Sequence, residues 1–173
     1  MSDAFLYLML QRRAALGVDT IPLLYIASSV AYLTLAIPMG RLADHVGRAS
    51  IFIAGHVFIV AVYATALLTD HLSAIGLVGC LALHGAYYAA TDGVLAALAS
   101  GLIPVEFRAS GLSALATTTS LAKFGGSLIL GVAWAMGGPS SVLVFGLLGT
   151  VAVLTMGMLR WPALLTARSE MVE

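Results

Sequence analysis

Long apolar segments joined by very short polar connections are the feature that most constrains the fold of this chain. The hydrocarbon core of a bilayer is about 30 Å thick, and a helix needs about 20 apolar residues to cross it. Spanning segments must satisfy their own backbone groups, and the alternating pattern of a membrane β-barrel is absent here. The sequence therefore predicts an all-α membrane protein with five transmembrane helices, at residues 21–40, 51–69, 72–103, 111–137 and 141–159.

Composition excludes several other classes of protein. Hydrophobic residues make up 61% of the chain and charged residues 9%, whereas a soluble domain carries about 25% charge. The charges of eight basic and eight acidic residues cancel, so the chain lacks the basic surface of a nucleic-acid binder. The high hydrophobic content makes the lipid bilayer the expected partner. The single cysteine, Cys80, excludes a cysteine-based metal site. No zinc-protease, phosphate-loop or nucleotide motif occurs, so we expect no metal, no cofactor and no enzymatic activity.

The prolines are placed as expected for helix ends, because proline lacks the N–H group that a helix interior needs. We expect Pro22 to open the first span and Pro38 to close it. The remaining prolines are predicted to lie between or after spans, at Pro104, Pro139 and Pro162.

The two termini are expected to differ in kind. Residues 4–10 are apolar but too few to cross a bilayer, and Arg12 and Arg13 follow them. This order is the reverse of that in a signal peptide. Within a single transmembrane domain of residues 1–173, we expect residues 1–17 to be the remnant of a helix and an outer loop, with the truncated helix near residues 3–16. Residues 163–173 are expected to form a cytoplasmic tail.

Basic residues set the expected orientation, because cytoplasmic loops of membrane proteins are enriched in arginine and lysine. Connections on one side carry most of the loop arginines: Arg41, Arg48, Arg108, Arg160 and Arg168. Connections on the other side carry only Arg12 and Arg13. The sequence thus predicts a multi-pass protein of the cell (plasma or inner) membrane with a cytoplasmic C-terminus.

The connection at residues 40–48, which reads GRLADHVGR, has a distinctive pattern. Gly40 and Gly47 permit a tight turn, and Asp44 is expected to accept hydrogen bonds at the start of the next helix. Arg48 would hold the connection at the cytoplasmic surface. The simpler interpretation is a charged turn of the kind that any multi-pass protein needs.

This connection resembles the G-x-L-x-D-x-x-G-R motif of the major facilitator superfamily, although His45 and Ala49 replace common basic residues. Residues 104–112, with Pro104, Glu106 and Arg108, resemble the segment that enters helix eleven of bacterial members. Residues 87–95 resemble helix ten. The order of the three segments implies half of a superfamily bundle, from the end of helix seven through helix twelve.

The resemblance implies secondary active transport of a small-molecule substrate, with this chain as the C-terminal fragment of a transporter. Such proteins place the substrate between two six-helix halves, so the N-terminal half is the expected partner. Two alternatives stay open. The chain could be a non-transporting membrane subunit that packs with a partner membrane protein, or an intramembrane enzyme that uses Asp92 and His84 as acid and base.

Two charged residues lie within predicted spans, Asp92 and Lys123. Charges at membrane depth are costly and usually functional. Residues four apart share a helix face, so each charge lies on a polar stripe: Cys80, His84, Tyr88 and Asp92 on one helix, and Thr119, Lys123 and Ser127 on the next. We expect the two charges to approach each other, either in a substrate or coupling-ion pathway that includes His84 and Tyr88, or as a structural ion pair.

Overall fold

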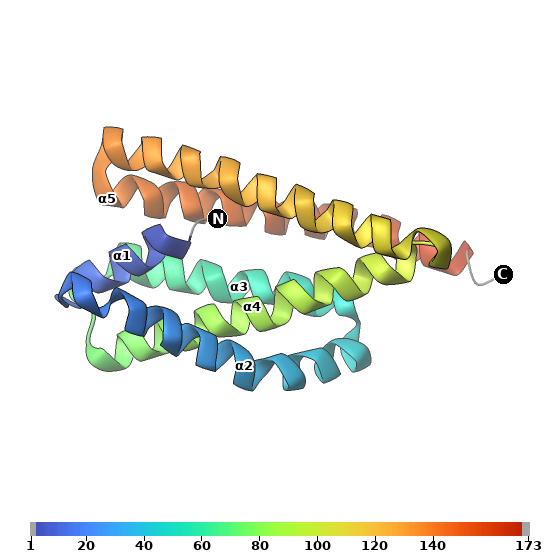
Figure 1. Cartoon of the computed structure of the whole chain (residues 1–173), viewed down its shortest axis with the longest axis horizontal. Coiled ribbons are helices and arrows are strands. Elements are labelled where there is room, and N and C mark those ends of the chain that lie inside the picture. The colour runs from blue at the N-terminus through green and yellow to red at the C-terminus, as the bar shows by residue number, and fades with distance from the viewer. Residues whose placement is uncertain (1–2, 171–173) are drawn as a thin grey trace.

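The computed structural model describes residues 3–170, except the side chains of residues 139, 140, 142, 153 and 156–170. Within residues 3–170 the chain forms helices and no strand, which confirms the all-α prediction (Figure 1). Two single-turn 3-10 helices accompany five longer helices. In chain order the elements are α1 (Asp3–Arg13), η1 (Val18–Thr20), α2 (Ile21–Val46), α3 (Arg48–Leu68), α4 (Ala74–Leu102), η2 (Val105–Phe107) and α5 (Arg108–Glu170).

Helix α5 is a hairpin of two antiparallel arms rather than one rod (Figure 1). Gly138 has φ 69° and ψ −168°, a conformation that glycine adopts without a side-chain clash. We call residues 108–137 the first arm and residues 139–170 the second arm. The reversal lies where the sequence predicts a turn between two spans.

Four helical segments of the described residues are long and apolar enough to cross a membrane: Val18–Val46, Arg48–Leu68, Ala74–Leu102 and Val105–Gly138. The chain is therefore an all-α membrane protein. The described side chains of the second arm include a shorter apolar stretch, Leu143–Ala152. Most side chains in the rest of the predicted fifth span, and those of the predicted tail at residues 163–173, are outside the part of the chain that the structure describes.

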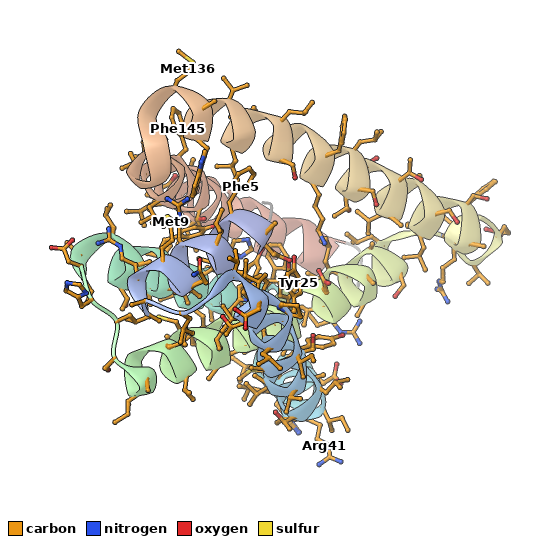
Figure 2. The ribbon with its side chains drawn as sticks, turned by 60° about the vertical axis from the view of Figure 1, so that its left-hand side comes forward. Phe5, Met9, Tyr25, Arg41, Met136 and Phe145 are labelled. Atoms are coloured by element: carbon orange, nitrogen blue, oxygen red, sulfur yellow. The ribbon has the colours of Figure 1, made fainter. Side chains whose placement is uncertain are left out.

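The connections between helices alternate between two ends of the bundle. The α2–α3 and α4–α5 connections lie at one end, together with the C-terminal end of the second arm (Figure 1). The α1–α2 and α3–α4 connections and Gly138 lie at the other end. We call these the α2–α3 end and the Gly138 end. At the α2–α3 end the exposed Arg41 side chain projects away from the bundle (Figure 2).

The prediction that Pro38 closes the first span is wrong, because α2 continues through Pro38 to Val46. A proline removes one helical hydrogen bond, but a helix in lipid has no water with which to replace its remaining backbone bonds. Continuing the helix is therefore favoured over breaking it. Pro22 does open α2, in its first turn.

The predicted tight turn at residues 40–48 is also wrong in extent, because only Gly47 leaves helical geometry. Gly47 has φ 104°, which explains the glycine there, whereas Gly40 is helical. Asp44 lies in the last turn of α2 and does not cap α3. Its carboxylate instead pairs with the Arg48 guanidinium at 3.2 Å.

The short helix α1 belongs to the core of the bundle. Leu6 and Leu10 are almost fully buried and pack in one cluster with Val62 of α3 and Leu143 of the second arm. Helix α1 ends at Arg13, earlier than the predicted residue 16. The Leu72 N–H donates a 2.8 Å hydrogen bond to the Arg13 carbonyl, which fixes the end of α1 against the α3–α4 connection.

Close helix contact at Gly85 holds α2 against α4. A Cβ atom on Gly85 would lie 2.5 Å from the Ala31 Cβ and 2.7 Å from the Tyr32 backbone nitrogen. The two backbones approach so closely because glycine has no side chain, as is common between membrane helices. This contact places the polar stripe of α4 beside α1 and α3.

Candidate functional site

A cavity of about 480 Å³ lies between α1, α3, α4 and the first arm of α5. The four side chains predicted to form a pathway, His84, Tyr88, Asp92 and Lys123, all line it. Aromatic rings and hydroxyl groups make up most of the remaining wall: Phe52, His56, Tyr63, Tyr87, Thr91, Thr118 and Thr119. The structure therefore collects the charged residues of the two polar stripes around one space.

The spacing of four residues on α4 explains how the stripe reaches the cavity. His84, Tyr88 and Asp92 follow one face of the helix, and that face meets the cavity over two turns. Cys80 continues the stripe toward the Gly138 end but is buried in the apolar core instead. Thr91 donates its hydroxyl proton to the Tyr87 carbonyl at 2.7 Å, so the oxygen remains available as an acceptor.

Asp92 and Lys123 share the cavity but form no direct ion pair among the described residues. The Lys123 ammonium instead lies 5.7 Å from the centroid of the Tyr88 ring, a distance typical of a cation–π contact. Both charged residues are exposed. The cavity is thus open on the side where Asp92 and Lys123 lie.

Asp3 is a residue of this site that the sequence analysis missed. The Tyr88 hydroxyl donates a 2.6 Å hydrogen bond to one Asp3 carboxylate oxygen. The other carboxylate oxygen lies 3.7 Å from Nε2 of His84. The sequence does show an acidic residue at the start of an apolar segment. A segment as short as α1, however, does not indicate how deeply the helix lies in the bundle.

His84 is the most enclosed polar residue of the cavity wall, with 1% of its side chain exposed. Its Nδ1 lies 3.1 Å from the Tyr7 hydroxyl, and its ring meets those of Tyr7 and Tyr88 edge to face. Its Nε2 is buried without a hydrogen-bond partner in the described part of the chain. A buried polar atom without a partner is uncommon and calls for an explanation.

His56 also lines this cavity. Its Nδ1 lies 2.8 Å from the Phe52 carbonyl oxygen. A carbonyl only accepts, so Nδ1 carries the proton, and Nε2 of the neutral ring is an acceptor. The ring also contacts Tyr87 edge to face. The cavity therefore contains acceptors, donors, charges of both signs and aromatic faces, which suits a small molecule with polar and apolar parts.

The two loop motifs lie away from this cavity. Gly40, Asp44 and Arg48 line a smaller space of about 260 Å³ between α2 and α4, toward the α2–α3 end. Arg48 also donates to the Ala97 carbonyl at 3.0 Å and so ties the start of α3 to α4. Gly47 forms the turn beside this space. Together these residues join three helices.

The second motif forms the connection between α4 and α5. Pro104 precedes η2, Glu106 lies within it, and Arg108 begins α5. The Phe107 N–H closes the turn with a 3.0 Å hydrogen bond to the Pro104 carbonyl. Glu106 and Arg108 are exposed, so this motif shapes the connection and contributes nothing to the cavity wall. No cluster of three metal-ligating side chains occurs among the described residues.

Comparison with known proteins gives one informative similarity. The chain is 32% identical over 125 residues to an uncharacterized MFS-type transporter of Methanocaldococcus jannaschii. The aligned segment covers 71% of this chain and 30% of that protein. No protein family profile matches the sequence, and no solved structure matches it. The chain is therefore a multi-pass membrane protein with a distant similarity to a transporter of the MFS, or major facilitator superfamily, type.

Proposed function

We propose that the chain belongs to the major facilitator superfamily and takes part in secondary active transport of a small molecule. The similarity to an MFS-type transporter over 71% of the chain carries this proposal. The segments at residues 40–48, 87–95 and 104–112 support it, because they follow one another in the order expected for the C-terminal half of such a protein.

The open side of the cavity supports the idea that a second wall completes it. Asp92 lies about 15 Å of helix from the end of α4, and Lys123 about 22 Å from the start of α5. Both charges are therefore at membrane depth, where facing lipid is costly. In this proposal an N-terminal six-helix half covers them, and the substrate binds between the halves.

The proposed orientation places the α2–α3 end in the cytoplasm of a cell that carries the protein in its plasma or inner membrane. Arg41, Arg48 and Arg108 lie in or beside the connections of that end. Arg12 and Arg13 lie at the Gly138 end. The excess of arginine at the α2–α3 end agrees with a cytoplasmic location of that end. The second arm of α5 then also ends on the cytoplasmic side.

A flux assay tests the proposed function. Cells that express the chain together with the N-terminal six-helix half that the proposal requires are screened for altered accumulation of a panel of labelled metabolites and drugs, and each hit is repeated in vesicles that contain both purified halves. The expected result is a flux that Asp92→Asn abolishes and that Asp70→Asn leaves intact. Asp70 is the control because its carboxylate lies on the exposed α3–α4 connection, where it pairs with Arg13 at 2.6 Å and is not part of the cavity wall.

Two outcomes would contradict the proposal. One is a flux that survives Asp92→Asn unchanged, which would separate transport from the cavity. The other is a folded chain without flux that co-purifies with a functional complex of other membrane proteins. That result would favour the alternative function, a membrane subunit that packs with a partner and does not transport.

A further inference from the structure

The inference concerns the contacts that link α1 to α4 at the closed end of the cavity. Four polar side chains form a continuous chain there: Tyr7, His84, Asp3 and Tyr88. The Tyr7 and Tyr88 contacts at its two ends, at 3.1 Å and 2.6 Å, have hydrogen-bond lengths. The central contact, from His84 Nε2 to the Asp3 carboxylate, is 3.7 Å, longer than a hydrogen bond.

The position of the protons in this chain follows from what each atom can donate. The Asp3 carboxylate accepts from Tyr88 and would repel a bare nitrogen lone pair on His84 Nε2. A neutral His84 ring is therefore most favourable with its proton on Nε2, directed at Asp3. Nδ1 then accepts a hydrogen bond from the Tyr7 hydroxyl. This arrangement accounts for the buried Nε2 without a hydrogen-bond partner.

The same four residues offer two places for one more proton, Nδ1 of His84 and the Asp3 carboxylate. If the proton goes to Nδ1, the Tyr7 hydroxyl rotates from donor to acceptor, and an imidazolium faces the Asp3 carboxylate. If it goes to Asp3, a neutral acid faces the neutral ring. Release of that proton restores the neutral ring beside the carboxylate, so the cycle needs no reactant other than the proton.

Other ionisable groups surround this pair on every packed helix. Tyr25 of α2 stacks on Tyr7, and the remaining groups line the same cavity: His56, Tyr63, Tyr87, Asp92 and Lys123. Lys123 is the cation among them, and its ammonium lies at the Tyr88 ring. Tyr88 contacts both Lys123 and Asp3, and His84 is the basic side chain within 4 Å of the Asp3 carboxylate among the described residues.

We propose that Asp3 and His84 form a proton-binding site that holds one exchangeable proton, and that occupancy of this site drives transport. The second part of this inference rests on the proposed function, whereas the first part does not. Because Asp3 is on α1 and His84 is on α4, binding and release of the proton change the contact between these two helices at the cavity wall.

Nuclear magnetic resonance of the purified full chain, with its histidines labelled with ¹⁵N, tests the proton site without any substrate. The chain has four histidines, His45, His56, His71 and His84, and the His84 signals are assigned as those that remain when each of the other three is replaced in turn with glutamine. The neutral His84 ring is expected to carry its proton on Nε2 in the unmodified protein. The opposite tautomer would overturn the proposal, and this measurement needs no variant at the site.

Titration between about pH 5 and pH 8, where histidine changes charge, tests the link to Asp3. In Asp3→Asn the imidazolium loses the facing carboxylate, so protonation of His84 is expected to need a more acidic solution than in the unmodified protein. Asp70→Asn, which removes a carboxylate at the Gly138 end, is expected to leave the titration of His84 unchanged. An unchanged titration of His84 in Asp3→Asn overturns the proton site.

The drive is tested in vesicles with an imposed pH gradient and a compound identified by the flux assay. Uptake by the unmodified chain is expected to follow the gradient, and uptake by Asp3→Asn is expected to lose at least about nine-tenths of that response, a change of roughly 1.4 kcal/mol or more. Equal responses of the unmodified chain and Asp3→Asn to the pH gradient would overturn the proposal that the proton site drives transport, and would leave transport itself intact. A His84 titration that depends on Asp3, in a chain that shows no flux even together with the N-terminal half, would overturn the proposed function and leave the proton site standing.

Discussion

The ammonium of Lys123 lies 5.7 Å from the centroid of the Tyr88 ring, so these two residues connect the first arm of α5 to α4. The contact is a cation–π interaction, and the ion pair with Asp92 that the two polar stripes suggest does not form among the described residues. Tyr88 has two roles in this arrangement, because its hydroxyl donates to Asp3 while its ring faces Lys123. Tyr88→Phe removes the hydroxyl and keeps the ring, whereas Tyr88→Leu removes both.

A double-mutant cycle is expected to locate the stabilising partner of Lys123. Coupling between Lys123→Met and Tyr88→Leu should be about 0.5–1 kcal/mol in the free energy of unfolding in detergent, as for an exposed cation–π contact. Coupling between Lys123→Met and Asp92→Asn should be close to zero. The reverse order of the two coupling energies would show that an ion pair dominates.

Replacement of Gly47 is expected to destabilise the α2–α3 connection. Alanine at φ 104° is strained, so Gly47→Ala should lower the free energy of unfolding by about 1–3 kcal/mol. Gly40→Ala is the matched control, because Gly40 is helical and a Cβ there meets no atom within 4 Å. This control should leave stability unchanged or raise it by up to about 1 kcal/mol. Equal effects of the two changes would contradict the single-residue turn.

Replacement of Gly85 is expected to force α2 and α4 apart. The added Cβ meets the Ala31 side chain at 2.5 Å and backbone of α2 at 2.7 Å, so Gly85→Ala should lower the free energy of unfolding by about 1–3 kcal/mol. Gly79→Ala on the same helix adds a methyl group with no atom within 4 Å. A loss of stability for Gly79→Ala as large as that for Gly85→Ala would show that α4 tolerates no substitution, whatever its contacts.

The orientation is tested by cysteine labelling in a Cys80→Ala background. Val46→Cys and His71→Cys place single thiols at exposed positions of opposite ends. A membrane-impermeant maleimide is expected to modify His71→Cys in intact cells and Val46→Cys only after the membrane is opened. Labelling of Val46→Cys in intact cells would reverse the proposed topology. Ala43 is unsuitable for this experiment because it is 3% exposed.

The all-helical fold and four of the five predicted spans could be predicted from the sequence, because each of these spans is a long apolar segment whose ends are marked by charge, glycine or proline. Pro38 is the exception, since its effect in water does not transfer to a helix in lipid. The same reasoning placed Asp44 at the start of α3, whereas the neighbouring Arg48 guanidinium competes for its carboxylate. Such choices between polar partners depend on side-chain directions that spacing does not fix.

The cavity wall could be predicted only within single helices. A spacing of four residues collects His84, Tyr88 and Asp92 on one face of α4, and the structure places all three at the cavity. Asp3 was missed because its role depends on where α1 docks, which is set by burial of residues such as Leu6 and Leu10 among other helices. That contact is between distant parts of the chain and leaves no local pattern.

The reversal at Gly138 has a consequence for how the chain enters the bilayer during synthesis. The first arm carries Lys123, and a lysine near the middle of a membrane helix opposes insertion by about 2.5–3.5 kcal/mol. The second arm follows after one non-helical residue, and its described side chains include the apolar stretch Leu143–Ala152. Because the connection between the arms is so short, we expect them to enter the lipid together, so that the apolar second arm offsets the cost of the lysine in the first.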